Sequence, residues 1–203
     1  MSSVLNGPVD DSAMSLGDAD TRWIGTDAGA LTGFAVAMVG DMDGDGKAEI
    51  AVGAPEEDTG GATAGAVYVL PGSTTGSALV TTGTAFLIGE NGDDYFGSSL
   101  GAAGDVDLDG RADLLAGARA DDWVDSDAGA AYVYRGPLSG TFSAATTAGK
   151  VVGAMSGDWA GYSVSGIGDV DGDGAPDIAV GAPTSDETDV DSGSVLFVFG
   201  WGG

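Results

Sequence analysis

The feature that most constrains the fold is an internal repeat of 64 residues, which runs three times along the 203-residue chain without a gap. Acidic stretches reading DMDGDGKAE, DVDLDGRAD and DVDGDGAPD begin at Asp41, Asp105 and Asp169. Flanking positions keep the same spacing, for example Gly65 and Gly129. A fixed period of this kind is typical of chains that stack copies of one structural unit.

Each repeat is expected to form four short strands and no helix, because its apolar runs are short, β-rich and separated by glycine or acidic turns. In the second repeat these strands would cover residues 85–90, 98–105, 112–118 and 129–136. Runs such as residues 67–70 are apolar on both faces, so each sheet must be covered on both sides. Small four-stranded sheets stacked on copies of themselves are the blades of a β-propeller. The sequence therefore predicts an all-β fold of three four-stranded blades.

The second repeat also carries the motif of a known family. It reads Phe96-Gly97, then Asp105, Asp107, Asp109 and Asp113, then Gly117-Ala118, and finally Gly129 and Tyr132-Val133-Tyr134. This pattern resembles the FG-GAP repeat of the integrin α-subunit propeller, and the resemblance covers nearly all of residues 21–203. The departures are mild: Phe-Gly is intact only in the second copy, and Gly-Ala-Pro only in the first and third.

The acidic stretches share a spacing that suits a hard cation. Aspartates stand at positions 1, 3 and 5, glycine at position 6 and a further acid at position 9. Calcium accepts six to eight oxygen ligands in a flexible geometry, which fits such a loop better than the strict octahedron of magnesium. An EF-hand would need glutamate at position 12, where Val52, Ala116 and Val180 stand, so these loops are not EF-hands.

We therefore expect three calcium sites, one per repeat, because four carboxylates in nine residues repel each other unless a cation lies among them. By resemblance to the loops of FG-GAP propellers, residue 7 would contribute its backbone carbonyl. The expected ligands are Asp41, Asp43, Asp45, Lys47 and Glu49 in the first loop, Asp105, Asp107, Asp109, Arg111 and Asp113 in the second, and Asp169, Asp171, Asp173, Ala175 and Asp177 in the third. A solvated acidic turn is the alternative for a single copy, and three copies in register argue against it.

Composition excludes several classes of protein. A net charge of −26 with six basic residues disfavours nucleic acid and anionic lipid as partners. The chain has no cysteine and no histidine, which removes disulfides, thiolate nucleophiles, the usual zinc sites and Ser-His-Asp catalysis. No segment is long and apolar enough to insert into a membrane. The tight acidic clusters are assigned to calcium, so we do not expect an enzyme.

Three blades are too few for a closed ring, since closed propellers typically have four to eight. Residues 21–25 align with 85–90 and 149–154, so the chain starts with a spare outer strand and lacks one after residues 194–200. We expect the repeat units to be 21–84, 85–148 and 149–203, after a lead segment of residues 1–20.

The ends of this array are apolar where repeat arrays usually carry polar caps. Head-to-tail association of copies would bury these ends and pair the edge strands, and it would give a ring or a filament. Two chains would make a six-bladed ring. The alternative is that the 203 residues are an excised fragment of a longer cell-surface propeller.

The first hypothesis for the function is a calcium-stabilised, extracellular or cell-surface module that associates with itself and serves adhesion or matrix roles. Residues 1–16 contain no secretory signal, which leaves a cytosolic protein or one whose signal has been removed. A carbohydrate-binding propeller is the alternative, with Trp123 as the candidate sugar platform and Trp159 as a weaker one that is more easily read as core. Possible partners are therefore the chain itself, a protein or a glycan.

Overall fold

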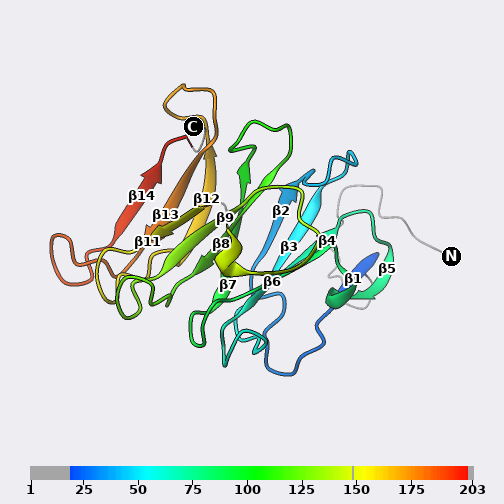
Figure 1. Ribbon diagram of the computed structural model, residues 1–203, viewed down its shortest axis with the longest axis horizontal. Coiled ribbons are helices and arrows are strands. Elements are labelled where there is room, and N and C mark those ends of the chain that lie inside the picture. The colour runs from blue at the N-terminus through cyan, green and yellow to red at the C-terminus, as the bar shows by residue number, and fades with distance from the viewer. Residues whose placement is uncertain (1–18, 148, 201–203) are drawn as a thin grey trace, which may run out of the picture.

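The structure is a computed structural model that describes residues 19–147 and 149–200, and within them it is an all-β molecule (Figure 1). The predicted lead segment of residues 1–20 lies outside the described residues except for Ala19 and Asp20. Helix is confined, in the described ranges, to the two 3-10 turns η2 (Val80–Thr82) and η3 (Ala144–Thr146). None of the described helical segments could cross a membrane.

Three twisted sheets form the blades of an incomplete propeller. The first blade consists of β2 (Val36–Gly40), β3 (Glu49–Ala54), β4 (Ala66–Pro71) and β6 (Ala85–Ile88). The second consists of β7 (Phe96–Gly104), β8 (Asp113–Ala118), β9 (Ala130–Tyr134) and β11 (Gly149–Val152). The third consists of β12 (Ser163–Gly168), β13 (Asp177–Ala182) and β14 (Ser194–Val198). Neighbouring strands within each blade are antiparallel. The observed strands match the predicted ones in the second repeat to within two residues.

Three short strands lie outside this pattern. β5 (Gly76–Leu79) and β10 (Gly140–Ser143) were not predicted, and they occupy equivalent places in successive repeats. β10 adds parallel to β6 at the edge of the first blade, and β1 (Thr21–Ile24) pairs parallel with β5 in the same way. β1 therefore stands where the outermost strand of a preceding blade would lie.

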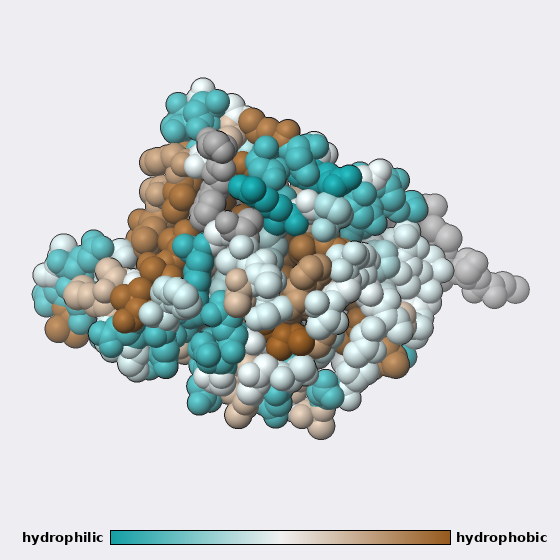
Figure 2. Space-filling view, viewed as in Figure 1, coloured by the Kyte–Doolittle hydropathy of each residue, from teal (hydrophilic) through white to brown (hydrophobic). Residues whose placement is uncertain are grey.

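Each blade takes its three inner strands from one repeat and its outermost strand from the next. This offset explains why the third blade has three strands: the residues that would supply its outer strand belong to a fourth repeat. Within the described chain, β14 pairs with β13 alone. β1 and β14 lie at opposite ends of the molecule (Figure 1), and apolar side chains gather over the β14 end (Figure 2).

Apolar cores lie between the blades, because both faces of each sheet are apolar. The core between the first two blades includes Val67, Leu87 and Leu114, and the next core includes Val133 and Ile178. Tyr68, Tyr132, Val69 and Val133, which the sequence places in the core, are at most 2% exposed. A third cluster, on the outer face of the first blade, joins Tyr68 and Leu70 to the side chain of Trp23 from β1.

Backbone bridges join adjacent blades at a repeated position, where Gly65 pairs with Phe96 and Gly129 pairs with Ala160. Gly129 has a φ of 77°, and a Cβ added there would overlap the backbone oxygen of Ala160. Only glycine satisfies both the left-handed backbone and the close approach. The repeat of this glycine therefore follows from the way the blades stack.

Replacing Gly129 by alanine should destabilise the protein strongly, and Gly140→Ala is the matched control. Gly140 also has a positive φ, of 90°, but an added Cβ would meet no atom within 4 Å. The control should lose about 1–2 kcal/mol from left-handed strain alone, and Gly129→Ala should lose at least about 2 kcal/mol more from overlap. Urea unfolding at saturating calcium measures the difference, and equal losses would contradict the account of the blade contact.

Candidate metal centres

The three acidic loops occupy equivalent places, each joining the two innermost strands of its blade. Asp41 follows β2, and Glu49 is the first residue of β3. Asp113 and Asp177 open β8 and β13 in the same way, as the repeat predicts. The strands thus hold the first and last acid of each loop in a fixed relation.

Backbone amides fold each loop around its first aspartate. The two carboxylate oxygens of Asp41 accept hydrogen bonds from the amides of Gly44 and Gly46, at 2.7 and 2.8 Å. Asp169 does the same in the third loop, through Gly172 and Gly174. These bonds make a compact turn whose carboxylates face one another.

The second loop departs from this geometry. Position 4 needs a positive φ, which glycine supplies in the first and third loops, whereas Leu108 adopts a φ of 59° in the second. One oxygen of Asp105 accepts a hydrogen bond from the amide of Asp109, at 2.9 Å, in place of the position-4 amide, while the other accepts from Gly110, at 2.8 Å, as in the other loops. The guanidinium of Arg135 also lies 3.3 Å from the carboxylate of Asp107, where it would compete with a bound cation. Sequence reasoning missed this contact.

The last acid of each loop is buried. Glu49, Asp113 and Asp177 are at most 2% exposed. In each loop, one oxygen of this acid accepts the amide of the residue after the first aspartate, at 2.7–2.8 Å. Burial raises the pKa of Asp113 to about 6, and the nearby charges of Asp107 and Asp105 act in the same direction. A cation at this place would relieve that electrostatic cost.

Carboxylate oxygens converge in all three loops, within 4.8 Å of one another. The converging residues are Asp41, Asp43 and Asp45 in the first loop, Asp105, Asp107 and Asp113 in the second, and Asp169, Asp171 and Asp177 in the third. These oxygen-only donor sets have the chemistry that a hard divalent cation requires. Glu49, Asp109 and Asp173 stand outside the converging groups, while Asp45 pairs with the ammonium of Lys47 at 3.4 Å.

Comparison with known proteins agrees with this architecture. The family model described as FG-GAP repeat matches residues 32–70, 96–134 and 160–198, one match for each blade. The chain belongs to the FG-GAP repeat family. Each match runs from just before the innermost strand, through the acidic loop, to the third strand of the blade.

Curated relatives of this FG-GAP chain are integrin alpha subunits. Integrin alpha-6 of Gallus gallus is 35% identical over 157 residues, which cover 74% of this chain and 13% of the relative. Integrin alpha pat-2 of Caenorhabditis elegans is 34% identical over 176 residues, covering 80% and 14%. Integrin alpha-7 of Rattus norvegicus is 36% identical over 157 residues, covering 74% and 12%. The chain therefore spans only a small part of the length of each of these relatives.

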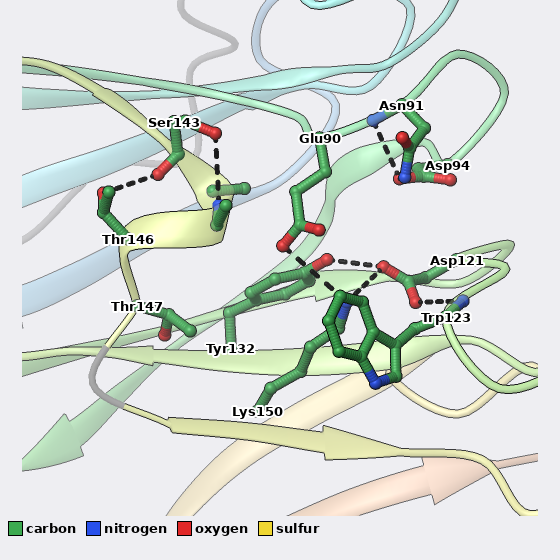
Figure 3. Close-up of polar contacts among 12 residues, drawn as sticks. Glu90, Asn91, Asp94, Asp121, Trp123, Tyr132, Ser143, Thr146, Thr147 and Lys150 are labelled. Atoms are coloured by element: carbon green, nitrogen blue, oxygen red, sulfur yellow. Dashed lines mark hydrogen bonds and ion pairs between the residues drawn. The ribbon is translucent and has the colours of Figure 1, made fainter.

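A second cluster of charges lies outside the FG-GAP acidic loops, around Lys150 on β11 (Figure 3). Its ammonium lies 2.8 Å from the carboxylate of Asp121 and 3.7 Å from that of Glu90. The same nitrogen lies 4.7 Å from the ring centroids of both Trp123 and Tyr132, and the hydroxyl of Tyr132 donates to Asp121. Sequence reasoning missed this cluster. The available signal was that lysine stands at position 150, whereas the equivalent residue of the first blade is Phe86, which stacks on Tyr68.

The two tryptophans considered as sugar platforms are both accessible. Trp123 is 71% exposed and borders a hollow of about 320 Å³, which Glu90, Thr147, Lys150 and Val152 also line. Trp159 is 39% exposed and stacks on Tyr162, so its interpretation as core was wrong. Its left-handed backbone, with a φ of 53°, is shared by Leu31 and Tyr95 at the equivalent positions.

Asp94 is a buried carboxyl close to this cluster, only 1% exposed. Burial raises the pKa of Asp94 to about 7, and the charge of Asp121 adds to the rise. The folded protein thus holds this proton more tightly than the unfolded chain, in which aspartate titrates near 3.9. Asp94 therefore costs stability increasingly as the pH rises from about 4 to about 7.

Asp94→Asn should be more stable than the parent at pH 8, by about 1–3 kcal/mol, and the advantage should disappear near pH 4. Denaturant unfolding at saturating calcium across this pH range measures it. Asp93→Asn, which neutralises the exposed carboxylate next in sequence, should not reproduce the pH-dependent gain. A loss of stability in Asp94→Asn at pH 8 would instead mean that the ionised carboxylate stabilises the fold.

Proposed function

We propose that the chain is a calcium-stabilised, extracellular interaction module of the adhesion type, which associates with further copies of itself. The observation that carries this proposal is the presence of three oxygen clusters, one at the same place in each blade, which share the acids at loop positions 1 and 3. A structural role for the cation follows from the location of the clusters, because each loop links the two innermost strands of a blade.

Calcium fits the loops by charge and by ligand type. Each loop offers three aspartates, a further buried acid and the backbone carbonyl of residue 7 to one ion. When the ion is bound it supplies the positive charge that offsets carboxylate repulsion, so its binding energy becomes folding energy. Arg135 partly offsets the charge of the second loop, and we expect that loop to bind calcium most weakly.

Adhesion and an extracellular location are supported by relationship and by surface chemistry. The relatives are integrin alpha subunits, which are cell-surface adhesion proteins, and the match covers the propeller repeats of this chain. Fold alone does not determine function, so the adhesion role is carried by the family and not by a site geometry. The acidic surface, with a net charge of −26, favours protein partners with basic patches.

Self-association is supported by the uncovered faces of the terminal blades. Val195 and Phe197 on the third blade are 61% and 57% exposed, and Met38 on the first is 74% exposed. Apolar faces of this kind are interaction sites in soluble proteins. Head-to-tail stacking would cover both faces and give a closed ring or a filament.

We propose no catalytic role. In the part of the chain that the structure describes, the converging carboxylates belong to the three loops. The buried acids outside them include those near Lys150, and Glu57 and Asp158, which accept hydrogen bonds within their own turns. Glycan binding is the second candidate function, favoured by the exposed ring of Trp123 beside the 320 Å³ hollow. Glycan-array binding that Trp123→Ala abolishes would support it, and an array without binding would remove it.

Calcium removal should lower the melting temperature and dissociate assemblies, because each loop loses the charge that balances its acids. Differential scanning calorimetry and mass photometry, with calcium and with chelator at neutral pH, measure both effects. A chain that melts and associates identically in chelator would overturn the proposal.

Asp171→Asn should reduce the number of bound calcium ions from three to two, as measured by titration calorimetry. Asn keeps the oxygen that accepts the amide of Asp173, so the turn is preserved. Glu56→Gln removes one exposed acid outside the loops and should leave the number unchanged. An unchanged stoichiometry in Asp171→Asn would exclude this aspartate as a ligand.

A further inference from the structure

We propose that β1 of one molecule completes the third blade of a second copy, by pairing antiparallel with β14. The register would be that of the internal blades. This inference rests on the self-association proposed above and specifies which strands meet. Three separate features of the described residues support it: two free strand edges, two uncovered faces and a hollow beside β1.

β14 has a free edge where the other blades are paired. In the first blade β6 covers this edge of β4, and in the second β11 covers the same edge of β9. Across the described ranges nothing pairs with β14 there. An unpaired edge of five residues is a template for another strand.

β1 is already placed as the outermost strand of a blade that its own chain does not supply. It aligns with β6 and β11 in the repeat, and it pairs parallel with β5 as β6 pairs with β10. Trp23 packs on the outer core of the first blade, just as Leu87 and Val151 of β6 and β11 pack on the cores that follow them. β1 therefore already lies in the place of an outermost strand before any partner strand pairs with it.

The other side of β1 borders open space. A hollow of about 650 Å³ is lined by Ala19 and by residues 21–25. Ile24 is 39% exposed at this place. A strand added to the free edge of β1 would enter this hollow.

The faces that would meet are the equivalents of buried ones. Val195 and Phe197 are 61% and 57% exposed, whereas Val67 and Val69, at the same positions of the first blade, are 0% and 1% exposed. On the opposite side, Val36 is 66% exposed, while its equivalents Leu100 and Val164 pack against the cores between blades. The third blade of one copy could thus cover the exposed face of the first blade of the next copy, as adjacent blades do within the chain.

The internal pairs set the register. Ala66 pairs with Ile88 and Ala130 with Val152, which predicts Ser194 opposite Ile24 of the second copy. The remaining pairs would be Val195 with Trp23, Leu196 with Arg22 and Phe197 with Thr21. Arg22 would then take the place of Lys150, facing the position of Trp123, which is Glu187 in the third repeat. A basic and an acidic side chain would meet across the joint.

β1 of one chain does not meet its own β14, because the two strands lie at opposite ends of the three blades (Figure 1). Blade-to-blade stacking repeated across the joint would bury Val36, Met38, Val195 and Phe197 together. Within residues 19–147 and 149–200, each copy has the free edge of β1 and that of β14, so every copy offers both halves of the same joint.

Disulfide cross-linking tests the register, since the chain has no cysteine of its own. Directly opposed residues of an antiparallel pair have Cβ atoms about 4.5–5.5 Å apart, which is close to what a disulfide needs. Ile24→Cys with Ser194→Cys should form covalent dimers and larger species under mild oxidation with calcium present. Asp20→Cys with Ser194→Cys is the control, since Asp20 lies about 13 Å away along the strand.

Phe197→Glu provides a second readout that does not depend on cysteine chemistry. It places a charge on the exposed face and should weaken association at least about tenfold in mass photometry, while circular dichroism shows the fold retained. Val124→Glu is the matched control, because Val124 is 50% exposed on an acidic loop of the second blade, which takes no part in the joint. It should associate like the parent.

The outcomes separate this inference from the proposal on which it rests. Cross-linking of the 24/194 pair and not of the 20/194 pair supports the joint. Assembly without that cross-link, or equal cross-linking of both pairs, overturns the joint and leaves self-association standing. A folded monomer at all concentrations in calcium overturns both, including the case of a fragment whose faces are covered by further blades of a longer chain.

Discussion

The packing of one two-sided apolar sheet on the next is the interaction on which the rest of this structure depends. Inner strands of the blades carry apolar side chains toward both neighbours, so each blade needs cover on both faces to bury all of them. The cores between the first and second blades, and between the second and third, satisfy this need inside the chain. The acidic loops, the glycine contacts and the exposed ends are all arranged around those two stacking surfaces.

The repeat period and the acidic spacing were sufficient to predict the blades and the location of the loops, because residues close together in the sequence specify both features. Strands such as β8 and β13 follow from continuous apolar runs, and Asp113 and Asp177 follow from the acidic spacing. β5 and β10 were missed because their stability comes from parallel pairing with β1 and β6, which lie 55 residues away in the chain. Such tertiary pairing leaves no periodic signal in four residues.

The acidic loops illustrate the same limit at the level of side chains. The spacing identified the acids, but it could not reveal that Arg135 from the end of β9 reaches Asp107, or that Leu108 adopts a left-handed backbone. The Lys150 cluster was also beyond local reasoning, since Glu90, Asp121 and Lys150 come from three separate segments. The interpretation of Trp159 as core failed because equivalence in the repeat was equated with burial, and the equivalent Leu31 is itself 49% exposed.

The offset between repeats and sheets has a consequence for how such chains can change length. A duplication or deletion of one 64-residue unit preserves every contact between blades in kind, since each unit gives the same segment to the preceding blade as its outermost strand. Adding whole units thus adds blades that use the same blade-to-blade contacts as the existing ones. If the units instead followed the sheet boundaries, each unit would contain all four strands of its own blade. Such a unit would give no strand to the neighbouring blade.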